Sequence, residues 1–323
     1  MHSNPSDSPF FVVGSDRSGT TMFRLMLNEH SRLHIPRESW FLMELMDNLP
    51  LQGKLSETDL ERAFTLISTH RRWKDWPSSD EDLVRVFKSL KAVTLAELVD
   101  SVFRGCGNLQ GKPRWGDKTP KYIDEVRRLS VLFPGAKFIH VIRDGRDVCM
   151  SLRGFRWQGE SIYSIAEYWR DVIYAGRRAE QLLGSEAYLE IDYEDIVVDP
   201  EASLRRVCQF LGEEYESAML EFHKNAAENI ADFEKEKGIH TKTMRAPRAE
   251  DIYRWKSEMS LIHVAMFEAV AGPAMEIAGQ KRKFRGPGLV LPLLCRAFIE
   301  LIKSTRPMRQ RFGLQFPALR RKM

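Results

Sequence analysis

The chain has 323 residues, of which 43% are hydrophobic, so it can bury the core of one large domain or of two small ones. Its four cysteines are scattered without a CxxC pair, which argues against a disulfide framework and against a zinc site. The first ten residues lack the pattern of a signal peptide, and no stretch reaches the roughly 18 apolar residues of a membrane span, so we expect a cytoplasmic protein.

The net charge of +4 is unevenly distributed. Residues 281–323 contain twelve lysines and arginines and one acid, Glu300, so they carry +11, which leaves −7 for residues 1–280. The basic character therefore belongs to a C-terminal extension and gives little support for nucleic-acid binding by the main body. We expect no nucleic-acid partner.

The first predicted element is an apolar run, Phe10 to Val13, typical of a buried strand. It is followed by GSDRSGTT and then by apolar residues at helical spacing. A strand, a glycine-bracketed turn and a helix start form a phosphate-binding loop, in which backbone N–H groups and the positive end of the helix face one anion. The residues expected to bind that anion are Ser15, Arg17, Ser18, Gly19, Thr20 and Thr21.

The spacing from Gly14 to Gly19 matches the loop of nucleoside-triphosphate enzymes, but that loop continues with a lysine, and this chain has Thr20 there. A triphosphate needs the lysine to reach its outer phosphates. We therefore expect a shorter anion at the end of a nucleotide, with Arg17 as the fixed charge. Two alternatives stay open: a kinase or other NTPase, and an inactive nucleotide-binding scaffold.

The remaining pattern alternates strands with helices, which predicts an α/β fold with a parallel sheet flanked by helices. Residues 39–112 are predicted to be a helical insertion, because serines and acids precede its apolar runs. Residues 224–250 are charged and predicted to be a loop. The other predicted strands cover 32–35, 137–142 and 187–191, and the other predicted helices cover 120–132, 161–183, 202–211 and 260–278.

A second cluster follows the predicted strand at 137–142. Arg143 stands where this strand meets the next helix, and ligands bind at that edge of open α/β sheets. Ser151 follows about two turns into the helix, so we expect both side chains to hold one phosphate.

Four motifs in this order resemble the sulfotransferases that use 3′-phosphoadenosine-5′-phosphosulfate: strand-RSGTT-helix, DKTP, FPGAKFIHVIRDGRD-x3-S and DYEDIVVDP. The resemblance covers roughly residues 8–280. It implies a sulfotransferase domain over 1–280, with the insertion on the acceptor side. It also implies that the loop holds the 5′-phosphosulfate, and that Arg143 and Ser151 hold the 3′-phosphate.

The finer pattern is similar to the tyrosylprotein branch of this family. That resemblance implies a catalytic glutamate at Glu38, twenty-one residues after Arg17, and a catalytic lysine at Lys118. Glycan sulfotransferases place a glutamate at nearly the same offset, so Glu38 does not identify the acceptor. The resemblance further implies nucleotide contacts from Tyr193 and, more loosely, from Thr241 and Arg254.

Sulfation of a hydroxyl needs a base, neutralisation of the departing phosphate and an in-line arrangement of the reacting atoms. We assign the role of base to Glu38. We expect Lys118 to contact the oxygen that bridges sulfur and phosphorus, and Arg17 to hold the 5′-phosphate. We expect no metal, because these fixed cations supply the charge that Mg²⁺ gives a kinase. The acceptor stays open among a small metabolite, a glycan or glycolipid, and a peptide tyrosine.

The last predicted element is a basic helical extension over 281–323, whose apolar part covers 286–303. Two interpretations stay open. The helix lies on the anionic inner face of a membrane, with its basic flanks on the headgroups. Alternatively, it packs on its own domain or on a second copy of the chain in a homodimer.

Overall fold

The computed structural model describes residues 8–107, 111–153, 161–226, 245–284, 292–295 and 297. At its centre is a five-stranded sheet with the order β2-β3-β1-β4-β5, in which every pairing is parallel. The predicted α/β fold is confirmed. The strands are β1 (Phe10–Gly14), β2 (Leu33–His34), β3 (Arg114–Lys118), β4 (Lys137–Ile142) and β5 (Tyr188–Asp192).

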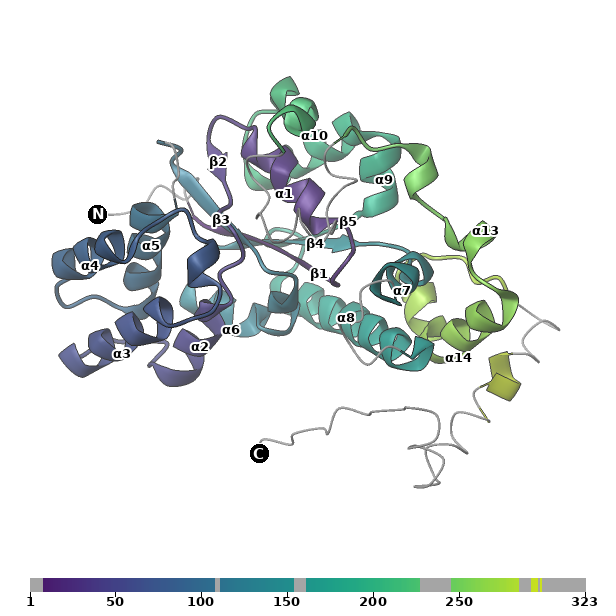
Figure 1. The fold of residues 1–323 in the computed structure, drawn as a ribbon, viewed down its shortest axis with the longest axis horizontal. Coiled ribbons are helices and arrows are strands. Elements are labelled where there is room, and N and C mark those ends of the chain that lie inside the picture. The colour runs from purple at the N-terminus through teal and green to yellow at the C-terminus, as the bar shows by residue number, and fades with distance from the viewer. Residues whose placement is uncertain are drawn as a thin grey trace.

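Helices cover both faces of the sheet (Figure 1). On β1, Phe10 and Val12 pack on one face, while Phe11 and Val13 pack on the other, because successive side chains of a strand alternate. The first face carries α1 (Thr20–Asn28), α9 (Tyr193–Val198), α10 (Pro200–Leu211) and the 3-10 helix η4 (Ser217–Lys224). The second face carries η3 (Pro120–Asp124), α6 (Val126–Leu132) and α8 (Ile162–Leu183).

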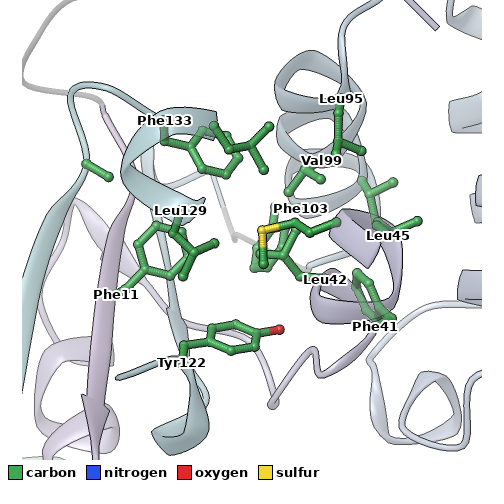
Figure 2. Packing of buried hydrophobic residues seen from close by; sticks show 14 of the residues in the cluster. Phe11, Phe41, Leu42, Leu45, Leu95, Val99, Phe103, Tyr122, Leu129 and Phe133 are labelled. Atoms are coloured by element: carbon green, nitrogen blue, oxygen red, sulfur yellow. The ribbon is translucent and has the colours of Figure 1, made fainter. Parts of the chain in front are cut away.

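Four helices of the region 39–112 lie beside this second face and share its core. Figure 2 shows Phe103 and Leu42 from this region opposite Phe11 of β1 and Leu129 of α6. Capping boxes begin three of the four helices, as the serines and acids of the sequence predict. The elements are α2 (Phe41–Asn48), α3 (Glu57–Ser68), the 3-10 turn η2 (Trp73–Asp75), α4 (Asp80–Ser89) and α5 (Leu95–Cys106).

Two local features differ from the sequence prediction. Strand β3 was not predicted, because its sequence RWGDK looks like a polar loop; yet the strand is buried along its whole length. Its Arg114 is satisfied by the carbonyls of Ser8 and Leu211 and by Glu213. The predicted helix at 120–132 is divided into η3 and α6, with Glu125 in a non-helical conformation between them.

A third group of elements lies beyond the carboxyl end of β4 (Figure 1). Helix α14 packs along α8, and both contact α7. The predicted loop and C-terminal extension are described only in part, so the interpretations of 224–250 and 286–303 stay predictions. Within the described residues, no helix is long and apolar enough to cross a membrane. The elements are α7 (Gly145–Arg153), η6 (Ala249–Asp251), α13 (Trp255–Glu258) and α14 (Leu261–Ile277).

Candidate active site

The predicted phosphate loop joins β1 to α1 at the carboxyl edge of the sheet. From β1 the chain crosses to β2 and β3 on one side, and from β4 it crosses to β5 on the other. Since β1 and β4 are neighbours, with Gly14 paired to Val141, their carboxyl ends form the point where the strand order reverses. Ligands of open α/β sheets bind at this point.

The loop is held in a tight turn that leaves its helix uncapped. Both the N–H and the hydroxyl of Ser18 donate to the carbonyl of Ser15, at 3.2 and 2.7 Å. Gly19 precedes α1 with φ of +91°, and within the described residues no side chain caps the helix. The N–H groups of the first turn, which have no intrahelical acceptor, are therefore available to an anion.

Position 19 requires glycine not only for its positive φ but also because there is no space for a side chain. A Cβ atom added there would lie 2.2 Å from the ring of Tyr193, which begins α9 after β5. The same ring lies under Arg143, whose Cζ is 4.6 Å from the ring centre. Tyr193 therefore contacts both halves of the predicted nucleotide site.

A residue that the sequence did not single out fixes the other side of the loop. The hydroxyl of Tyr168, on α8, accepts from the N–H of Asp16 at 2.8 Å and donates to the Asp16 carboxylate at 3.2 Å. Burial raises the pKa of Asp16, and the nearby Glu38 carboxylate adds to the increase. The two residues are 152 positions apart, so no local pattern could have paired them.

Arg17, Arg143 and Ser151 lie together, as the strand order requires. Nε of Arg17 donates to Oγ of Ser151 at 3.0 Å, and Nη1 of Arg143 donates to the Arg17 carbonyl at 3.1 Å. Arg17 has a positive φ of 68°. The sequence predicted two separate binding sites, one for each end of a nucleotide. In the structure, Arg17 of the first site contacts Ser151 and Arg143 of the second.

Arg143 has one donor without an acceptor. Nη2 donates to the Asp251 carbonyl at 3.1 Å and lies 3.7 Å from the Asp147 carboxylate. Its Nε is buried, and among the described residues no group accepts a hydrogen bond from it. An unpaired buried donor on a cation is costly, so an anionic ligand at this position would stabilise the site.

Glu38 and Lys118 form an ion pair beside the loop, and we call them the Glu38–Lys118 pair. Lys118 ends β3 and donates from Nζ to Oε1 of Glu38 and, at 3.3 Å, to Oγ1 of Thr21. Its side chain is 5% exposed, so the charge is strongly desolvated, whereas Glu38 is 22% exposed and open to a second reactant. The pair therefore places a carboxylate and an ammonium next to the N-terminus of α1.

The insertion supplies the other contacts of Glu38. Oε2 accepts from Nε1 of Trp40 at 2.7 Å and lies 3.9 Å from Nη2 of Arg72. Burial alone would raise the pKa of Glu38, but the charge of Lys118 and the hydrogen bonds from Lys118 and Trp40 outweigh it and lower that pKa. Glu38 is therefore ionised at neutral pH.

A buried polar network lies behind the pair. Ser39, next to Glu38, donates to Asp117, next to Lys118, and lies 2.6 Å from the hydroxyl of Tyr122. Burial raises the pKa of Asp117 to about 7. The network joins the two chain segments that carry the Glu38–Lys118 pair.

Arg146, for which no role was predicted, joins α7 to the C-terminal part of the fold. Its guanidinium donates to both Asp144 oxygens and to Glu268, at 2.7 to 2.9 Å. The same group stacks on the ring of Trp255 at 3.5 Å. Since Asp144 adjoins Arg143, this cluster fixes the start of α7 at the candidate site.

Two further nucleotide contacts, Arg254 and Thr241, stay predictions. Arg254 forms a double hydrogen bond with Glu258 at 2.7 Å on α13, so its side chain is engaged along its own helix. Thr241 lies outside the described residues. Across the described ranges, no group of three or more His, Cys, Asp or Glu side chains is arranged to hold a metal ion.

The fold and the loop define a parallel α/β protein in which a glycine turn and an uncapped helix start lie at the point where the strand order reverses. Residues 9–217 match the model of the sulfotransferase family, which is more than half of the chain. The chain therefore belongs to the sulfotransferase family, and the predicted resemblance is confirmed.

Individual relatives agree with this assignment. Protein-tyrosine sulfotransferase A of Caenorhabditis elegans is 26% identical over 230 residues, and an uncharacterized protein of Aquifex aeolicus is 27% identical over 243 residues. These matches cover 69% and 68% of this chain but only 55% and 28% of the relatives, so the chain spans about half of their length or less.

A solved structure supports the fold. The sulfotransferase domain of the Synechococcus PCC 7002 olefin synthase superposes with a TM-score of 0.57 and covers 86% of this chain and 95% of its own. The two sequences are 23% identical, so the similarity extends to the fold alone.

Proposed function

We propose that this chain transfers a sulfuryl group from 3′-phosphoadenosine-5′-phosphosulfate to an acceptor hydroxyl. The observation that carries the proposal is that the uncapped loop helix, the Arg17–Ser151–Arg143 contacts and the Glu38–Lys118 pair meet at one edge of the sheet. When bound, the donor would supply the sulfuryl group and a phosphate as the leaving group.

The residues present fit a nucleotide with two anionic groups. The N–H groups at the start of α1 and the hydroxyls of Thr20 and Thr21 suit the 5′ group, because the helix end carries a partial positive charge. The unpaired Nε of Arg143 suits the 3′-phosphate, with Ser151 as a second donor and Tyr193 beneath the guanidinium.

The Glu38–Lys118 pair supports the roles of base and leaving-group cation. Glu38 is ionised and partly exposed, so it can accept the proton of a hydroxyl. The Lys118 ammonium lies beside Thr21 in the loop, where negative charge develops on a departing phosphate oxygen. When Lys118 turns towards that oxygen, Glu38 loses part of its stabilisation and becomes a stronger base.

For the acceptor, we propose a phenolic hydroxyl as the first class to test. The C. elegans relative is named a protein-tyrosine sulfotransferase. Trp40 is partly exposed and contacts the carboxylate of Glu38, and an aromatic acceptor can stack on an indole ring.

The test measures transfer of labelled sulfate from the donor to tyrosine-containing peptides and small phenols. We expect Glu38→Gln to reduce the rate by about 10²–10⁴-fold, the usual contribution of a general base. Glu44→Gln is the matched control, because Glu44 is an exposed carboxylate on neighbouring α2 and should leave the rate unchanged. Equal rates for wild type and Glu38→Gln would remove Glu38 from the base role.

A further inference from the structure

The residue after the Glu38–Ser39 segment has an unusual backbone conformation. Trp40 has φ of +50° and ψ of −38°, and the N–H of Phe41 donates to the carbonyl of Ser39 across it. This is the three-residue turn in its rare form with positive φ. A bulky non-glycine residue in such a conformation is strained and persists only where its surroundings enforce it.

Core packing does not account for the position of Trp40. Trp73 and Trp76 of the same insertion are 4% exposed and lie within the aromatic core, whereas Trp40 is only partly buried. The strained turn directs the indole N–H of Trp40 back onto Oε2 of Glu38, two residues earlier. The strain is therefore located where it orients a carboxylate, and strained conformations cluster at functional sites.

We propose that Trp40 is the positioning residue of the catalytic base, an inference that rests on the proposed function of Glu38. The indole N–H fixes Oε2, while Lys118 contacts Oε1, so the plane of the carboxylate is set from both oxygens. Ser39 is bonded to Asp117 in the buried network, so the segment that carries Glu38 and Trp40 is anchored at its centre. Trp40 acts through Glu38 and takes no proton itself.

Trp40 also affects the proton affinity of Glu38, because its hydrogen bond stabilises the ionised carboxylate. Other charged or titratable groups also interact electrostatically with this carboxylate. They are Lys118 from β3, Arg72 from the insertion, Asp16 from the loop, and Asp117 and Tyr122. Since none of these groups is altered by replacing the indole, loss of the N–H raises the pKa of Glu38. The acidic limb of the rate profile should therefore move to higher pH.

The test compares Trp40→Phe with Trp73→Phe in the full chain. The control is matched, because Trp73 also donates its indole N–H to a carboxylate at 2.7 Å, but the acceptor is Asp80 and not Glu38. For Trp40→Phe we expect kcat to fall about tenfold or more, because a small misplacement of a reacting group has effects of this size. We also expect an upward shift of the acidic limb and an unchanged KM for the donor.

Trp73→Phe should lower Tm and leave kcat and the pH profile as in wild type. The positioning role is overturned if Trp40→Phe retains the wild-type kcat and acidic limb, or if both Trp variants lose activity only in proportion to their loss of Tm. The outcome for Glu38→Gln separates the two proposals. If Glu38→Gln is as active as wild type, the proposed function of Glu38 fails; if it is inactive while Trp40→Phe is normal, only the positioning role fails.

Discussion

Replacing Gly19 with alanine tests the geometry of the phosphate loop. The new Cβ would lie 2.2 Å from the Tyr193 ring, far inside van der Waals contact, and the residue would keep a φ of +91°. Overpacking of this kind costs about 1–3 kcal/mol. The left-handed conformation adds about 1–2 kcal/mol for a residue with a Cβ atom. We therefore expect the free energy of unfolding to fall by roughly 2–5 kcal/mol, with loss of nucleotide binding.

A double-mutant cycle separates the two contributions. Gly53→Ala is the control for the backbone, because Gly53 has φ of +85° with no atom within 4 Å of the added Cβ, so only the conformational cost applies. In a Tyr193→Ala background, the added Cβ of Gly19→Ala no longer clashes with the Tyr193 ring, and only the cost of the left-handed conformation remains. We expect a coupling energy of about 1–3 kcal/mol between positions 19 and 193 from urea denaturation.

The binding of adenosine 3′,5′-bisphosphate, measured by calorimetry, reports on the site itself. Gly19→Ala should bind it more weakly than Gly53→Ala at temperatures where both are folded. Strictly additive effects at positions 19 and 193, with wild-type binding by Gly19→Ala, would refute the account of the loop.

Two further predictions concern buried charge. The folded-state pKa of Asp117 is about 7 and its ordinary value is 3.8, so the folded chain keeps a proton that the unfolded chain loses, and stability falls as pH rises from about 4 to about 7. The free energy of unfolding of Asp117→Asn, relative to that of wild type, should therefore increase over that pH range and stay constant above it. If urea titrations give the same difference at every pH, this prediction is contradicted. Arg146→Ala removes the cation that pairs with the buried carboxylates of Asp144 and Glu268. We expect the free energy of unfolding, measured by denaturation, to fall by about 3–5 kcal/mol. A fall below about 1 kcal/mol would show that the cluster does not hold α7.

Features set by short stretches of sequence could be predicted. The loop between Phe10 and Thr21 and the position of Arg143 at a strand end depend on local patterns of apolar residues, glycines and polar residues. The strand order, which the structure supplies, places β1 beside β4 and so brings Arg17 into contact with Arg143 and Ser151. The fold class and the residues at the centre of the candidate site were therefore accessible from the sequence.

Features that depend on tertiary contacts were not accessible. Strand β3 looks like a loop, because its burial is made tolerable only by distant acceptors such as the Leu211 carbonyl. The link between Asp16 and Tyr168 spans 152 positions, and nothing in the local sequence connects them. Trp40 resembles a core residue until its strained turn and its bond to Glu38 are seen.

The central claim is that Arg143 binds the 3′-phosphate of the nucleotide, while the loop binds its 5′ group. Calorimetry with adenosine 3′,5′-bisphosphate, adenosine 5′-monophosphate and ATP, on wild type and Arg143→Met, tests it most directly. We predict that wild type binds the bisphosphate about 10–100-fold more tightly, since one charge-assisted hydrogen bond contributes about 1.5–3 kcal/mol. Arg143→Met should lose most of this preference, because Ser151 alone then remains to bind the 3′-phosphate. Equal wild-type Kd values for the two nucleotides, or tighter binding of ATP than of the bisphosphate, would contradict the account.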